Sequence, residues 1–172
     1  MWLFFGKIKE KNMKKIYLIR HAKAVKKGDD FERKLSKSGK DELKKLFKKL
    51  ANFNIKPDFI LSSPAVRTVK TAKKLAKFYD FDKNDIKFDK NLYLASCATL
   101  LNALKNINSN HKEIFLVGHN PAIMELAELL SSLCLESFPT SSMLCLEFDI
   151  DDFANLKEHS GKLVFFEHIR SL

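Results

Sequence analysis

The sequence predicts an α/β fold, a three-layer sandwich with a mainly parallel central sheet, an antiparallel edge and helices on both faces. Two observations predict it. Up to residue 133, short apolar runs alternate with segments of helical periodicity, which is the order that builds a parallel sheet. Apolar and polar residues then alternate one by one over 144–150, as in an antiparallel edge strand. The 172 residues suffice for one domain, and the chain shows no repeat or linker.

The first strand and helix of this scheme frame a pair of polar residues. Residues 16–19 form an apolar run, which predicts a buried strand whose carboxyl end places Arg20 and His21 in the following loop. Ser36 is a favourable N-cap, and the apolar residues after it recur at helical spacing up to Leu50. We expect this helix to bury one stripe against the sheet and to expose its lysines.

The middle of the chain predicts two more strands and two more helices. Residues 58–61 indicate the second strand, and the polar turn after it leads into a helix over 66–76. Pro64 suits the first turn of that helix. Residues 85–88 indicate a short strand, and the leucines of 100–107 indicate a third helix.

The last part of the chain contains the central strand and the sheet edge. Residues 113–117 predict a buried strand, followed at once by Gly118-His119-Asn120-Pro121 and a helix over 123–133. Gly161 marks a turn before a further apolar run at 163–166. Together with 144–150, this run predicts one or two antiparallel strands at the edge of the sheet.

The charge balance is basic, with 31 Lys+Arg against 21 Asp+Glu and a net charge of +10. Such a charge suits an anionic partner. Only four of the basic residues are arginines, and the lysines are scattered in stretches that read as solvated surface. A nucleic-acid-binding face would add base-contacting arginines and stacking aromatic residues, so we expect no nucleic-acid partner. The alternative class is a basic nucleic-acid binder. Its affinity for nucleic acid would fall steeply with salt and would be unchanged in the variant His21→Ala.

The cysteines and the apolar runs bear on the compartment. Cys97, Cys134 and Cys145 are an odd number without C-x-x-C spacing, which favours a reducing cytoplasm and core positions for all three. No apolar run reaches the ~20 residues of a membrane span, so we expect no membrane partner. Residues 1–12 are a possible N-terminal extension, and 13–172 are expected to form the single domain.

Candidate functional residues follow three predicted strands. Arg20 and His21 come after the first strand, Arg67 opens the helix after the second, and His119 follows the central one. Ligands of open α/β sheets bind outside the carboxyl ends of the strands, so these side chains are expected to converge. Guanidinium forks and helix N-terminal N–H groups bind phosphate oxygens, which predicts a phosphoryl site. No carboxylate or cysteine stands beside either histidine as a further ligand, so we expect no metal and no cofactor.

These residues lie in four ordered motifs that resemble those of the histidine phosphatase superfamily, with its phosphoglycerate mutase-like fold, and within it the small phosphohistidine phosphatases of the SixA type. The resemblance runs from about Lys14 to the carboxyl terminus. The four motifs are Leu18-Ile19-Arg20-His21-Ala22, with Ala in the place of a Gly; Arg33-Lys34-Leu35-Ser36-Lys37-Ser38-Gly39; Ser62-Ser63-Pro64-Ala65-Val66-Arg67-Thr68-Val69-Lys70-Thr71-Ala72; and Val117-Gly118-His119-Asn120-Pro121.

The resemblance implies a role for each motif residue. His21 is the nucleophile that becomes phosphohistidine, while Arg20, Arg67 and His119 hold the phosphoryl oxygens. Arg33 and Asn120 complete the expected substrate-binding set, and a solvent-exposed structural role is the open alternative for Arg33. Physical reasoning agrees, because phosphoryl transfer asks mainly for positioning and positive charge. Two guanidinium groups near His21 are expected to lower its pKa and keep the imidazole neutral.

A carboxylate is missing where relatives that act on alcohol phosphates have a glutamate, because residues 91–96 contain no acid. Asp89 and Glu125 are the remaining candidates for a general acid. An alkoxide needs a proton to leave, whereas an imidazole protonated on its far nitrogen leaves as a neutral ring. The expected activity is therefore metal-independent hydrolysis of phosphohistidine on a protein by a monomeric enzyme, with a histidine-phosphotransfer protein as one candidate substrate. A small-molecule phosphomonoesterase of the same superfamily and a non-catalytic phosphoprotein-binding module remain open alternatives.

Overall fold

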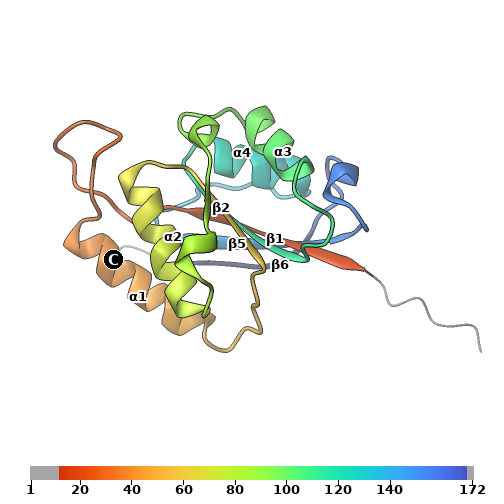
Figure 1. The fold of residues 1–172 in the computed structure, drawn as a ribbon, viewed down its shortest axis with the longest axis horizontal. Helices are drawn as coiled ribbons and strands as arrows, with labels where there is room; N and C mark the ends of the chain where they lie inside the picture. The colour runs from red at the N-terminus through yellow and green to blue at the C-terminus, as the bar shows by residue number, and fades with distance from the viewer. Residues whose placement is uncertain (1–11, 170–172) are drawn as a thin grey trace, which may run out of the picture.

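The computed structural model describes residues 12–169, and these form one six-stranded sheet between two layers of helices (Figure 1). The first strand begins at Met13. The predicted extension falls on residues 1–12, of which 1–11 lie outside the described residues, so it stays a prediction. No helix within 12–169 is long and apolar enough to cross a bilayer.

The sheet is parallel in its middle and antiparallel at one edge. Its strands, in the order β3-β2-β4-β1-β5-β6, are Lys87–Phe88, Phe59–Ser62, Glu113–Gly118, Met13–Arg20, Ser142–Asp149 and Lys162–His168. The first four run parallel to one another. Strand β5 runs antiparallel to β1, and β6 runs antiparallel to β5. This arrangement confirms the predicted sheet with its antiparallel edge.

Helices cover both faces of the sheet, as expected for a three-layer sandwich. Helices α1 (Lys37–Leu50) and α2 (Val66–Phe78) lie on one face, and α3 (Cys97–Lys105) and α4 (Ala122–Leu130) on the other (Figure 1). Strand β1 shows why two cores form, because its side chains alternate between the faces. Ile16 and Leu18 belong to the core under α3 and α4, whereas Tyr17 and Ile19 belong to the core under α1 and α2.

Several boundaries differ from those predicted. Pro64 lies before the N-cap of α2, which is Ala65, and not in the first helical turn. Residues 83–85 form a 3₁₀ turn, so only two residues of the predicted 85–88 strand pair with β2. Helices α3 and α4 end before Ile107 and Leu133, which the sequence placed inside the two helices. Both apolar side chains still pack on the same core, from the segments that follow the helices.

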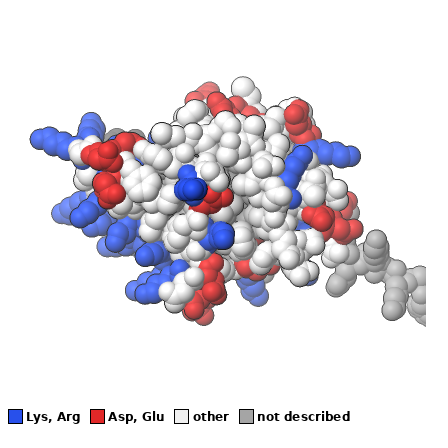
Figure 2. Space-filling model, turned by 45° about the horizontal axis from the view of Figure 1, so that its top comes forward, with Lys and Arg blue, Asp and Glu red and all other residues white. Residues whose placement is uncertain are grey.

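The lysines and Cys145 lie where the sequence predicted, but Cys134 does not. The lysines of α1 are exposed, and Lys and Arg side chains gather in Figure 2 on the side where α1 lies in Figure 1. Cys145 is buried as expected, but Cys134 is exposed, in the segment after α4. The core prediction for Cys134 was therefore wrong.

Strand register brings the predicted functional residues to one edge. Arg20 pairs with Gly118 at the ends of β1 and β4, and Ser62 pairs with Val117 at the end of β2. The loops that follow these three strands therefore start side by side, although their residues are far apart in the sequence.

Candidate active site

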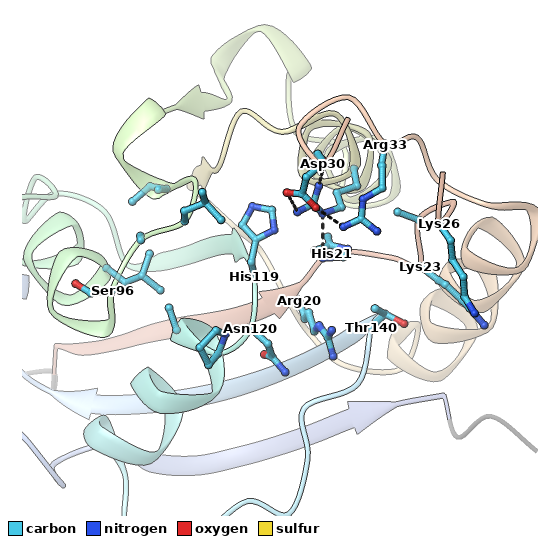
Figure 3. A pocket seen from close by; sticks show the side chains of 18 residues that line it. Arg20, His21, Lys23, Lys26, Asp30, Arg33, Ser96, His119, Asn120 and Thr140 are labelled. Carbon is cyan, nitrogen blue, oxygen red and sulfur yellow. Dashed lines mark hydrogen bonds and ion pairs between the residues drawn. The ribbon is translucent and has the colours of Figure 1, made fainter. Parts of the chain in front are cut away.

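A cleft of about 690 Å³ opens at the carboxyl ends of the parallel strands. All six residues that the sequence singled out line it, namely Arg20, His21, Arg33, Arg67, His119 and Asn120. Figure 3 shows the rings of His21 and His119 near each other, with Asp30 and Arg33 on one side of them and Arg20 and Asn120 on the other. The two ring centroids are 5.2 Å apart.

The hydrogen bonds of His21 define its reactive nitrogen. Its Nδ1 lies 2.8 Å from the backbone carbonyl oxygen of Ala22. A carbonyl can only accept, so Nδ1 carries the proton and donates it. The lone pair is then on Nε2, which lies 3.3 Å from the Nε of Arg67 and accepts its hydrogen. His21 therefore presents a neutral imidazole with its nucleophilic nitrogen turned toward a cation.

The environment keeps His21 neutral. The residue is only 9% exposed, and burial lowers the pKa of its imidazole to about 3. The positive charges of Arg67 and Arg20 act in the same direction as smaller causes. The predicted direction is correct, but desolvation outweighs the guanidinium charges that we expected to cause it.

Arg67 is held in the cleft by the loop that precedes α1. The residue is 5% exposed, and its Nη1 and Nη2 donate to the backbone oxygen of Asp30 and to its carboxylate. The N–H of Val66, at the start of α2, donates to the carbonyl of Phe31. That N–H is therefore committed within the protein, contrary to the expectation that the helix terminus offers it to a ligand.

His119 is also buried enough to be neutral. Its Nε2 is 2.8 Å from the hydroxyl of Ser63, which follows β2. Burial first and the charge of Arg67 second lower the pKa of His119 to about 4, although Asp30 opposes this shift. The ring of Tyr93 packs edge-on against it at 5.8 Å between centroids.

Three buried polar atoms of the cleft have no hydrogen-bond partner among the described residues: Nε of Arg20, Nδ1 of His119 and Oδ1 of Asn120. The other ends of Arg20 and Asn120 are anchored, because both donate to the carbonyl of Phe138. Buried polar atoms without partners are rare in folded proteins. Here they lie around one cleft, where the oxygens of a bound anion can accept from donors such as Arg20 Nε.

Comparison with known proteins finds one family model that matches part of the chain. Residues 16–93 match the model of the histidine phosphatase superfamily, branch 1. Over this segment the chain is similar to the histidine phosphatase superfamily.

Solved structures agree over nearly the whole chain. One, from Agrobacterium tumefaciens and assigned as the phosphohistidine phosphatase SixA, is 26% identical, with 91% of this chain and 98% of that chain covered and a TM-score of 0.76. The protein histidine phosphatase SixA solved with tungstate is 17% identical, with 90% and 96% covered and the same TM-score. A mycobacterial glucosyl-3-phosphoglycerate phosphatase is 15% identical, with 88% and 97% covered and a TM-score of 0.61. No curated protein matched the sequence.

One departure from the superfamily motif is accommodated by the fold. Ala22 takes the place of a glycine, and the residue is fully buried with its N–H donating to Thr71 Oγ1 at 3.0 Å. Ala22 does not have a positive φ. The loop after His21 therefore does not need the conformational freedom of glycine at this position.

The cleft also contains a carboxylate that the sequence analysis did not predict. Asp30 forms ion pairs with Arg33 and Arg67 and accepts a hydrogen bond of 2.6 Å from the Tyr93 hydroxyl. These donors hold the pKa of its carboxyl well below the usual range. Asp30 lies three residues before Arg33 in a motif that we had quoted, and that proximity was the available signal.

The two carboxylates that the sequence suggested as acids do not line the cleft. Asp89 caps a 3₁₀ turn by accepting from the N–H of Asn91 at 2.9 Å, and Glu125 is exposed on α4. Among residues 12–169, no group of three or more His, Cys, Asp or Glu side chains is placed to hold a metal ion.

Proposed function

We propose that this protein hydrolyses phosphohistidine on a protein substrate through a phosphorylated His21, without using a metal ion. The observation that carries the proposal is the pair of hydrogen-bond contacts that His21 makes, from which its tautomer follows. Its Nδ1 proton is held by Ala22, which leaves Nε2 as a neutral nucleophile beside Arg67. The match of residues 16–93 to the histidine phosphatase superfamily supports phosphatase chemistry in this cleft.

The first step transfers the phosphoryl group to His21. Nε2 of His21 attacks phosphorus while the bond from phosphorus to the substrate imidazole breaks, and that imidazole keeps the bonding electron pair. Arg67 and Arg20 lie beside the position of the transferred group and offset the charge on its three equatorial oxygens, and the neutral His119 can donate a hydrogen bond to one of them. In the second step water attacks the phosphorus of phospho-His21, which releases phosphate and restores the imidazole.

The state of Asp30 favours phosphohistidine over a phosphate ester as the substrate. Among residues 12–169, Asp30 is the one acidic residue that lines the cleft, and its low pKa keeps it ionised. An ionised carboxylate has no proton to give to a departing alkoxide. A substrate imidazole that carries a proton on its far nitrogen leaves as a neutral ring and does not need that acid.

Side-by-side turnover assays test the proposal. We expect hydrolysis of a phosphohistidine peptide to exceed that of a phosphoserine peptide and of a sugar phosphate. Vanadate is expected to inhibit, and EDTA to leave the rate unchanged. Preference for the sugar phosphate would replace the proposal with the small-molecule esterase, and activity restored after chelation only by a divalent ion would contradict the metal-free mechanism.

Variants of His21 test the intermediate. His21→Ala is expected to abolish turnover, and quenching the wild type with labelled substrate should trap an acid-labile phosphoryl group on His21. His159→Asn, at a histidine that lines neither the cleft nor the hollow next to it and whose positive φ suits asparagine, is the matched control and should retain wild-type turnover. Undiminished hydrolysis by folded His21→Ala would remove the nucleophile assignment.

A further inference from the structure

An apolar side chain projects into solvent at the mouth of the cleft. Leu94 is 78% exposed and has a φ of 54°, in the left-handed region that side chains other than Gly, Asn and Asp rarely adopt. Its neighbours hold it there, because Leu92 is buried in the core and the hydroxyl of Tyr93 is bonded to Asp30. The leucine is thus fixed outward at a cost in backbone strain.

Leu94 stands on a ridge between two hollows. The segment that includes Leu92, Leu94, Ala95 and Ser96 lines the catalytic cleft and also a second hollow of about 710 Å³. That second hollow extends over Phe59 of β2 and along α3. A partner surface can therefore close around the leucine from both sides and bury it.

The opposite side of the mouth is cationic. Lys23 and Lys26, from the loop between β1 and α1, line the cleft and are exposed. Figure 3 shows them across the cleft from Ser96, with His21 and His119 between. The mouth therefore has an apolar side at Leu94 and a positively charged side at the two lysines.

If the proposed function holds, the burial of His21 determines which kind of molecule has to cover the mouth of the cleft. His21 is 9% exposed at the bottom of the cleft, and a histidine side chain is short. A phosphohistidine on a protein reaches Nε2 only if the protein surface around it touches the mouth on both sides. We propose that Leu94 and the pair Lys23 and Lys26 form a docking surface for the phosphoprotein substrate, which presents an apolar hollow on one side of its phosphohistidine and carboxylates on the other.

The test compares a protein substrate with a small one. The probes are a histidine-phosphotransfer domain phosphorylated on its histidine, and N-phosphoimidazole, which carries the same reacting bond and cannot contact the mouth. Leu94→Asn removes the apolar group and suits the left-handed backbone, so the fold is preserved. We expect kcat/KM for the phosphorylated domain to fall about tenfold, while kcat/KM for phosphoimidazole stays within about twofold.

Matched controls separate docking from general surface effects. Leu163→Asn alters a leucine that is 39% exposed on β6 and does not line the cleft, and it should change neither value. Lys26→Glu is expected to weaken turnover of the phosphorylated domain more than Lys44→Glu, which makes the same charge change on an exposed position of α1.

The outcomes distinguish the docking proposal from the proposed function. Equal effects of Leu94→Asn on both probes, or none on either, would overturn the docking surface. Turnover of phosphoimidazole without turnover of the phosphorylated domain would overturn it too, and would leave the phosphatase chemistry intact. Turnover of neither probe by the intact protein would overturn the proposed function itself.

Discussion

At the level of single residues, the chemistry of the cleft depends on competition for one guanidinium group. Arg67 donates to His21 through Nε and to Asp30 through both terminal nitrogens. A bound phosphoryl group needs donors of the same kind. The carboxylate of Asp30 is therefore an internal anion that a substrate phosphate must compete with.

Asp30→Asn tests this competition. Removing the negative charge is expected to tighten vanadate binding about fivefold, a modest change because the carboxylate is half-exposed and screened. Asp30 also raises the pKa of His119, so the variant should lower that pKa further. Calorimetric titration with vanadate and NMR titration of the imidazole measure the two effects.

Asp29→Asn is the control, because it removes the same charge from the same loop at a residue that does not line the cleft. Weaker binding of vanadate by Asp30→Asn would show the opposite relation, in which Asp30 mainly positions Arg67 and its loss disorders the guanidinium.

At the level of elements, the start of α1 is tied to the loop after His21. The N–H and the hydroxyl of Ser36 both donate to the carbonyl of Lys23, at 2.9 and 3.1 Å. Gly39, one turn into the helix, packs so closely that an added Cβ would collide with the same carbonyl. The helix therefore needs glycine for its close approach, and the motif residue Gly39 holds the cleft loop in place.

The variant Gly39→Ala tests this packing, because the sign of its change in stability distinguishes two opposing effects. Helix propensity alone would make the variant about 1 kcal/mol more stable. We expect the collision with Lys23 to win, lowering the free energy of unfolding by about 1–3 kcal/mol, and kcat/KM to fall because Lys23 is two residues from His21. Urea unfolding and turnover assays measure both quantities.

Lys40→Ala, at the next and exposed position of the helix, is the control and should be nearly neutral. A Gly39→Ala variant that is more stable than the wild type, with unchanged turnover, would refute the packing explanation.

Among the elements, β1 and β3 show what a pattern of residues can predict. Strand β1 is flanked on both edges and covered on both faces, so residues 16–19 in its middle are all apolar and its position was predictable. Strand β3 has two residues and, within the described part of the chain, pairs only with β2. Its length depends on where the neighbouring strand stops, which no local pattern records.

At the level of the whole molecule, folding buries two imidazoles in their neutral form. The pKa of His21 falls to about 3 and that of His119 to about 4, against 6.5 for an unfolded histidine. Between pH 6.5 and 4 the unfolded chain binds protons that the folded protein does not. The free energy of unfolding must therefore fall as pH falls through this window.

We expect that fall to reach up to about 1.4 kcal/mol per pH unit for each histidine. His119→Asn removes one of the two groups, so its stability should fall less steeply than that of the wild type between pH 6.5 and 4.5. Urea unfolding followed by circular dichroism at several pH values, in buffers without phosphate, measures the slopes. Identical slopes for the two proteins would contradict the linkage.

The amino-acid sequence by itself determined the layer architecture, the antiparallel edge and the positions of Arg20, His21, Arg67 and His119 at strand ends, because hydrophobic periodicity and strand–loop order are local properties of the chain. Arg33 and Asn120 were predicted only from the resemblance of their motifs to a known family. Tertiary structure alone decided that Asp30 forms an ion pair with Arg67, that Ser63 contacts His119, and that Leu94 faces solvent. Each of these depends on where a loop lies relative to residues far away in the chain. The reason is that packing around the sheet determines which side chains come into contact, and the spacing of residues along the sequence does not encode that packing.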